Sequence, residues 1–150
     1  LVILDNGTTA MTGHQPNPGV AEEILGDISV HVDIGKVVEG CGVTQLARVR
    51  PYNLRGTIKV LEEMKEMKGV RVLIVEEPCV LYARRTLKRT RAQYAYVDEQ
   101  GPEVEECHET LGCPAFGKHD GEVVIDPEMC SGCMVCLQIT SKIKARKKEA

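Results

Sequence analysis

The stretch Cys130-Ser-Gly-Cys-Met-Val-Cys136 decides how the last part of this 150-residue chain folds. Its cysteines recur at every third position, and Gly132 supplies the backbone freedom that a loop wrapped around one centre requires. Three thiolates from one loop, joined by a fourth from elsewhere, commonly hold a cubane iron–sulfur cluster. The spacing therefore predicts a [4Fe-4S] site. A zinc knot is the alternative, although zinc sites favour two separated Cys-x-x-Cys pairs.

A candidate for the fourth thiolate lies upstream, in the segment Leu111-Gly-Cys-Pro114. In bacterial ferredoxins with two clusters, a cysteine followed by proline ligates the cluster of the other cysteine triplet. Cys113 is therefore the candidate for the remote ligand.

Composition limits the class of protein. Hydrophobic residues make up 43% of the chain, which is enough for a core, and the net charge of -3 gives no support for nucleic-acid binding. Five of the seven cysteines lie between residues 107 and 136, and the chain shows no signal peptide, so a disulfide framework is not expected. The apolar runs are too short to span a membrane. We expect a reducing, cytoplasmic location.

The first half of the chain alternates between strand and helix patterns, and we expect its opening buried-strand pattern to lie within a larger fold. Apolar side chains at Ile58, Leu61 and Met64 recur at helical spacing between charged positions. Near-continuous apolar strands alternating with helices predict a parallel α/β layer. The expected strands cover residues 1–4, 43–49 and 70–75, and the expected helices cover 33–39, 52–67 and 81–87.

The composition changes near residue 88, where Leu87-Lys-Arg-Thr-Arg91 reads as a linker. Beyond it we expect short strands at 93–97 and 122–125, the latter forming a hairpin with 115–118 around a turn at 117–121. The basic segment 142–148 is predicted to be a solvated, frayed tail. A docking patch for an acidic electron carrier is the alternative for this segment.

Several segments together resemble one enzyme family. They are residues 1–19 (Leu-Val-Ile-Leu-Asp-Asn-Gly-Thr-Thr-Ala-Met-Thr-Gly-His-Gln-Pro-Asn-Pro-Gly), 33–42, 49–54, 75–79, 111–114 and 125–130. They are similar to the alpha (large) subunit of indolepyruvate:ferredoxin oxidoreductase. The resemblance implies an α/β fold. Residues 1–88 would be the end of a truncated, parallel-sheet thiamine-diphosphate-binding domain, and 89–150 a small ferredoxin-like α+β iron–sulfur domain. The chain would then be the C-terminal part of a longer polypeptide.

The same resemblance implies a function. The family decarboxylates aryl 2-oxo acids on thiamine diphosphate, forms an acyl-CoA from CoA, and passes electrons through iron–sulfur clusters to ferredoxin. A second (beta) subunit is expected. The family's Mg²⁺ site falls on Asn6 and on the backbone carbonyl of Thr8, while its Gly-Asp-Gly half is not found in this sequence. Met11 lies on the loop beside the thiazolium ring, and His14 is a candidate proton or hydrogen-bond donor to the substrate, or else a solvated loop histidine.

Compared with the family's two cluster motifs, this chain keeps one complete set of ligands. By the crossed arrangement of two-cluster ferredoxins, one cluster would use Cys113, Cys130, Cys133 and Cys136. The other would use positions 101, 104, 107 and 140, which are Gly, Val, Cys and Thr. The resemblance therefore predicts one cluster, with Cys107 left as an orphan thiol.

Other functional classes stay open at this point. One is an electron-transfer module without catalysis of its own, and the other is a zinc-stabilised interaction domain. Three histidines, His31, His108 and His119, are not expected to take part in catalysis. Cys41 and Cys79 are expected to be buried, inert thiols.

Overall fold

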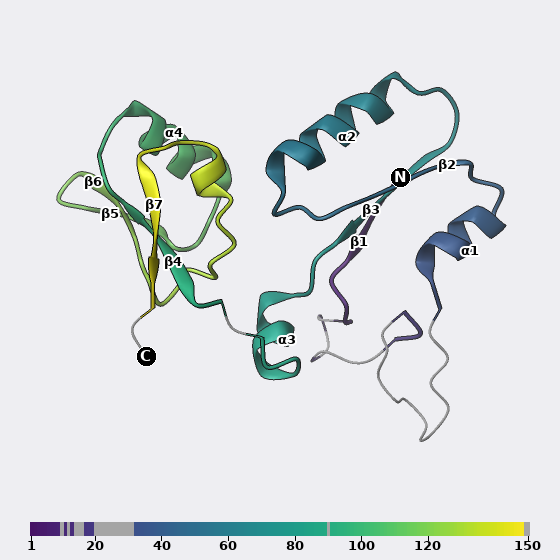
Figure 1. Ribbon diagram of the computed structural model, residues 1–150, viewed down its shortest axis with the longest axis horizontal. Coiled ribbons are helices and arrows are strands. Elements are labelled where there is room, and N and C mark those ends of the chain that lie inside the picture. Colours follow the sequence, from purple (N-terminus) through teal and green to yellow (C-terminus); the bar gives the residue numbers. More distant parts are fainter. Residues whose placement is uncertain (10, 12, 14–16, 20–31, 90, 149–150) are drawn as a thin grey trace. The chain divides into compact units, whose positions relative to one another are not determined.

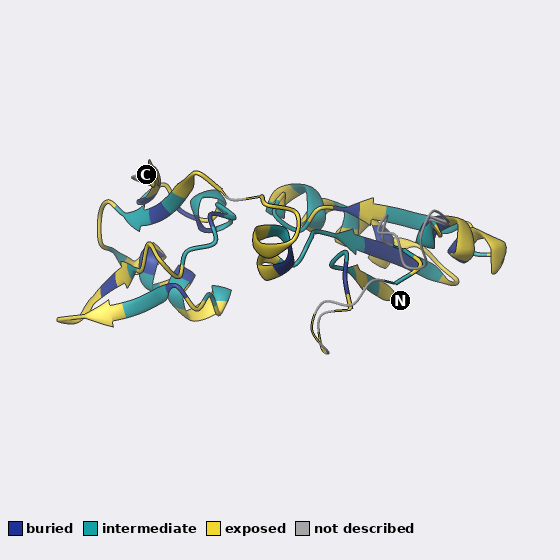
Figure 2. Cartoon of the chain, turned by 90° about the horizontal axis from the view of Figure 1, so that it is seen from below, coloured by how far each residue is buried: buried dark blue, intermediate teal, exposed yellow. Residues whose placement is uncertain are grey.

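A computed structural model describes residues 1–9, 11, 13, 17–19, 32–89 and 91–148. The chain forms two compact units, residues 1–89 and residues 90–150. Figure 2 shows buried positions within each of them, so each unit has a core of its own. The two units are described separately below.

The first unit is built on a three-stranded parallel sheet of β1 (Val2–Asp5), β2 (Gln45–Val49) and β3 (Arg71–Glu76), in the order β1-β3-β2. β3 lies in the middle, and its residues from Val72 to Ile74 are almost completely buried. Such a run of apolar side chains is what a strand covered on both faces requires. The predicted parallel α/β layer is confirmed.

Helices cover both faces of this sheet: α1 (Ile34–Gly40) packs on one and α2 (Leu54–Glu66) on the other (Figure 1). Val38 of α1 packs with Val72 and Ile74, whereas Met64 of α2 packs with Leu73. Neighbouring residues of β3 therefore serve opposite cores, as the alternation of side chains along a strand demands. A third helix, α3 (Val80–Arg85), follows the central strand.

Polar caps fix where the two covering helices begin. The side chain of Asp33 accepts a hydrogen bond from the Lys36 backbone N–H at the start of α1, and Asn53 accepts one from Gly56 at the start of α2. These bonds satisfy backbone donors that the first helical turn leaves open. All three helices lie within two residues of the predicted ranges.

The second unit combines strands, one long helix and the cysteine-rich loop. β4 (Gln93–Val97) pairs antiparallel with β7 (Ile143–Lys147), and β5 (Phe116–His119) forms a hairpin with β6 (Glu122–Ile125). Between them lie α4 (Pro102–Leu111) and the 3₁₀ turn η2 (Cys136–Gln138). The core consists of Ala95, Val104, Cys107, Val123, Cys136 and Ile143.

Three expectations for this unit were wrong. Residues 142–148 are not a frayed tail: β7 pairs with β4 over five residues, and Ile143 lies in the core. The hairpin turn is shorter than predicted, because Gly117–His119 belongs to β5 and only Asp120 and Gly121, both at positive φ, make the reversal. The helix α4 was not predicted, although Val104, Cys107 and Leu111 recur at helical spacing and pack in the core.

Candidate functional site

The carboxyl ends of the three parallel strands meet at one edge of the first sheet, which we call the carboxyl edge (Figure 1). There Asp5 is paired in register with Glu76, and Val49 with Val75. Open α/β sheets place their ligands at this edge. The segment that begins at Asp5 therefore starts where a cofactor is expected.

Two hydrogen bonds hold Asn6 in place directly after β1. Its side-chain oxygen accepts the Thr8 backbone N–H at 3.1 Å, and its backbone carbonyl accepts the Cys79 N–H at 2.9 Å. Thr8 is buried, and Gly7 adopts a left-handed φ of 71° that glycine accommodates without strain. The loop is thus held in one conformation, with hard oxygen donors of the kind that Mg²⁺ prefers.

The structure does not place Met11 or His14, the other two residues predicted for this site, beside Asn6. The side chain of Met11 is 98% exposed, and His14 lies outside the described residues. Their assigned roles beside a thiazolium ring and a substrate stay predictions. His31 also lies outside the described residues.

An ion-pair network next to the carboxyl edge was not anticipated. The guanidinium of Arg48 on β2 pairs with Glu76 at the end of β3 and with Asp33, the cap of α1. The Lys36 backbone N–H, helped by Arg48, holds the pKa of Asp33 below its usual range. This network connects β2 and β3 with the start of α1. It therefore fixes the backbone of these three elements near the carboxyl edge. Arg48, a charged residue between the apolar Ala47 and Val49, was the available signal.

The second candidate site is the cysteine loop, residues 130–136. Its backbone turns through left-handed conformations at Gly132 (φ 72°) and Met134 (φ 61°), and Val135 returns to a right-handed helical one. Alternation of this kind turns successive N–H groups toward a common point, as in many iron–sulfur sites. The Ala95 backbone N–H also donates to the Sγ of Cys130 at 3.4 Å.

The predicted cysteine ligands are distributed unequally around this loop. Cys136 is buried in the core, where it belongs to the same cluster of side chains as Cys107 and Cys130. Burial, together with the neighbouring thiols, raises the pKa of Cys136 to about 12. Cys133 and Cys113 are half-buried. Burial and the neighbouring Cys113 thiol also raise the pKa of Cys107, so this orphan thiol lies beside the predicted remote ligand.

The donor set of the loop fits an iron–sulfur cluster in chemistry, because its thiolates are soft ligands and backbone N–H groups approach their sulfurs. All seven cysteines are free. In the part of the chain that the structure describes, however, no three Cys, His, Asp or Glu side chains come together closely enough to hold a metal ion. The four-cysteine ligand set therefore stays a prediction.

The degenerate second set does not fit a cluster. Val104 and Cys107 are fully buried among core side chains, and Thr140 is also buried. A side chain at Gly101 would meet the Lys142 ammonium group, which pairs with Glu103. The positions around Cys107 are thus occupied by an apolar core and an ion pair, and offer a single soft ligand.

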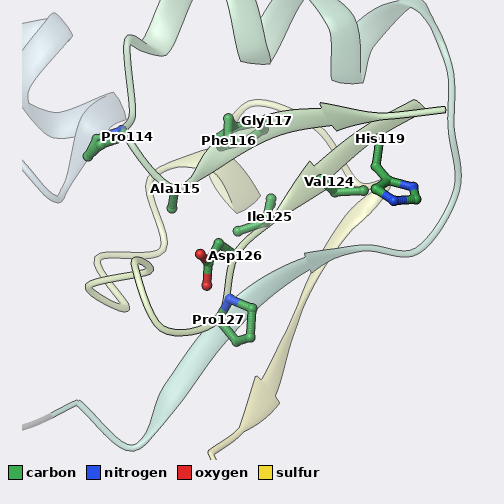
Figure 3. Close-up of a pocket in the computed structure, with 9 residues that line it drawn as sticks. All are labelled: Pro114, Ala115, Phe116, Gly117, His119, Val124, Ile125, Asp126 and Pro127. Atoms are coloured by element: carbon green, nitrogen blue, oxygen red, sulfur yellow. The ribbon is translucent and has the colours of Figure 1, made fainter. Parts of the chain in front are cut away.

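A shallow hollow of about 460 Å³ lies along the β5–β6 hairpin, next to Cys113 in the sequence. Figure 3 shows the His119 ring at one end of it and Asp126 with Pro127 at the other. The Asp126 carboxylate accepts the backbone N–H groups of Glu128 and Met129, so it caps a turn. Its role is to shape the segment that leads into the cysteine loop.

Two thiols differ from expectation. Cys41 is exposed rather than buried, because it lies just past the end of α1, and Cys79 is only half-buried at the start of α3. Basic side chains were also missed as neighbours of the cysteine loop. Arg91 approaches the Gly132 carbonyl at 3.5 Å, and Lys148 donates to the Cys130 carbonyl at 3.2 Å. The basic linker 87–91 was the signal for Arg91, and the basic run 142–148 was the signal for Lys148.

Comparison with known proteins places these features in a family. The profile of the thiamine pyrophosphate enzyme, C-terminal TPP binding domain, matches residues 1–75. Indolepyruvate oxidoreductase subunit IorA of Archaeoglobus fulgidus is 41% identical over 140 residues, that of Methanothermobacter thermautotrophicus 40% over 140, and that of Thermococcus kodakarensis 32% over 144. Each match covers 93% of this chain and 22% of the relative. The resemblance seen in the sequence is confirmed.

The chain therefore spans about a fifth of the length of the curated relatives that it matches, 22% in each case. No solved structure matches it significantly. Within the described ranges, no helix is both long enough and apolar enough to cross a bilayer.

Proposed function

Because the chain belongs to the thiamine pyrophosphate enzymes, through their C-terminal TPP binding domain, we propose that it is part of a 2-oxo acid:ferredoxin oxidoreductase. The substrate class would be aryl 2-oxo acids such as indolepyruvate, with CoA as acyl acceptor, ferredoxin as electron acceptor and a second (beta) subunit. The observation that carries the proposal is the similarity of 93% of the chain to IorA subunits. The cytoplasm, where seven free thiols stay reduced, is the proposed location.

The carboxyl edge supports a thiamine-diphosphate role for the first unit. The Asn6 side chain and the Thr8 carbonyl would hold Mg²⁺, which the cofactor's phosphates share. When bound, thiamine diphosphate supplies the electron sink for loss of CO₂ from the 2-oxo acid. The chain's own contribution is to fix these oxygen donors, through the Asn6 contacts to Thr8 and Cys79.

The cysteine loop supports an electron-transfer role for the second unit. Cys130, Cys133 and Cys136, joined by Cys113, would hold one [4Fe-4S] cluster, which supplies one-electron transfer when bound. The Ala95 N–H at the Cys130 sulfur would stabilise the charge on that thiolate. Because burial raises the pKa of the Cys136 thiol, it is protonated without metal at neutral pH, and cluster assembly would release its proton.

Iron and sulfide analysis of the anaerobically reconstituted chain tests this proposal. We expect about four of each per chain and a brown protein with broad absorption near ~400 nm. Cys133→Ala should abolish the cluster, whereas Cys107→Ala should leave it, although both remove one thiol from the same unit. Zinc in place of iron would contradict the redox assignment, and about eight irons per chain would contradict the single cluster.

A further inference from the structure

The positive charges along β7 are neutralised at its first end. Lys142 lies 3.0 Å from a carboxylate oxygen of Glu103 and 3.7 Å from one of Glu99, and Lys144 pairs with Asp98. These partners come from the end of β4 and the start of α4. Positive and negative charges at this end of the strand are therefore nearly balanced.

At the other end of β7 the balance is different. Arg146, Lys147 and Lys148 are exposed, and within the described residues none of them pairs with a carboxylate. Arg146 is held over the ring of Tyr96, at 4.5 Å from its centroid, so its charge is fixed in position although it forms no ion pair with a described residue. We call these three residues the basic end.

The basic end lies against the cysteine loop. The Lys148 backbone N–H continues the strand pairing by donating to the Ala92 carbonyl at 2.8 Å, and its ammonium group reaches the Cys130 carbonyl at 3.2 Å. Met129, which precedes Cys130, exposes 55% of its surface. An exposed apolar side chain beside uncancelled positive charge thus flanks the first thiol of the proposed cluster.

From this arrangement we propose that the basic end and Met129 form the docking surface for an acidic protein electron carrier. The inference rests on the proposed function and specifies its electron exit. With a cluster bound at the cysteine loop, one electron would pass from the reduced cluster to the oxidised cluster of the carrier, and no bond would form or break. Complementary charge accelerates such an encounter, whereas the apolar contact allows close approach. The chain as a whole has a net charge of -3, so an acidic carrier is attracted to this local positive surface in preference to the rest of the chain.

Electron transfer from the cluster-loaded full chain to an acidic two-cluster ferredoxin, followed by stopped-flow spectroscopy, tests the proposal. We expect the double variant Lys147→Gln/Lys148→Gln to lower the second-order rate constant about ten-fold at low ionic strength, and the difference to shrink at high salt. The matched control is Lys118→Gln/Lys144→Gln. It removes two charges from the same unit, but both are already paired with Glu105 and Asp98, so its rate should stay within about two-fold.

The outcomes distinguish a failure of the proposed function from a failure of the docking surface alone. If the chain holds no iron, the proposed function fails, and the docking surface with it. If iron is bound but both double variants react as fast as the unmodified chain, the docking surface alone is wrong. Strong competition by a DNA duplex would also overturn it, since the basic end would then be a general polyanion surface. A neutral quinone as acceptor should react equally with all variants, which checks that the cluster itself is unchanged.

Discussion

At the scale of single residues, Gly132 shows what the sequence could and could not reveal. The need for a flexible residue between Cys130 and Cys133 followed from the spacing alone. The reason found in the structure is more specific, because a Cβ at this position would lie 2.5 Å from the Gln93 carbonyl oxygen. That contact joins residues far apart in the chain, so no local pattern predicts it.

Gly132→Ala should therefore destabilise the cysteine loop more than an ordinary glycine substitution does. A left-handed conformation alone costs alanine about 1 kcal/mol, and the clash with backbone should raise the total to about 2–3 kcal/mol. Gly112→Ala is the control, because Gly112 has a positive φ of 56° and open space around its Cβ position. Amide hydrogen exchange of β4 measures the difference, and equal protection in both variants would contradict the role of the contact.

Cys113 and Cys107 compete, on structural grounds, for the place of the fourth ligand. Cys107 shares a core with Cys130 and Cys136, whereas the ligand arrangement implied by the family resemblance assigns Cys113. We expect Cys113 to resist alkylation while the cluster is bound and to react after iron is chelated. Peptide mass mapping of the alkylated protein gives the readout. Modification of Cys113 at full iron content would show that the remote ligand is a different residue.

At the scale of elements, the alternation of apolar strands and helices located most of the first unit correctly. Helix α2 was predicted because its apolar side chains, such as Ile58, Leu61 and Met64, repeat at helical spacing. The prediction for β7 was wrong because its outward positions are almost all basic. Such a charged sequence is also typical of a segment that is exposed to solvent on every side. A two-stranded pairing buries only Ile143 completely, and one apolar residue is a weak signal in a sequence.

Replacing Ile143 by alanine distinguishes a packed strand from a frayed tail. Ile143 is 2% exposed and belongs to the core, so its truncation should reduce the stability of the second unit by about 2–4 kcal/mol. Ile139→Ala removes the same atoms at a position that is 43% exposed and should have a much smaller effect. Urea denaturation followed by circular dichroism compares the two, and equal midpoints would indicate that β7 contributes nothing.

At the scale of the whole molecule, the chain carries its two candidate cofactor sites on two separate units. The parallel sheet and the ends of its strands followed from the apolar pattern, and the identity of the thiamine site followed from the resemblance of residues 1–19. Spacing alone could not show that Asn6 is fixed by the distant Cys79 or that Arg48 binds Asp33 and Glu76. These contacts form only when the three strands of the sheet have come together.

The 150-residue chain by itself should not bind thiamine diphosphate tightly. Mg²⁺ requires nearly octahedral coordination, and this sequence supplies only the Asn6 and Thr8 positions of the family's site, without a Gly-Asp-Gly turn. Isothermal titration with Mg²⁺ and the cofactor should show no saturable heat at micromolar concentrations, where binding corresponds to about -8 kcal/mol. A longer chain that includes the turn is the positive control. Micromolar binding by the chain alone would mean that other residues complete the site.

The position of β1 at the margin of its sheet has a practical consequence. Among the residues that the structure describes, β1 pairs with β3 alone, and the side chains of Leu4 and of the preceding Leu1 are 76% and 78% exposed. Unpaired backbone groups next to exposed leucines form a template onto which another strand can add. We therefore expect self-association of this chain in concentrated samples to involve the edge of β1.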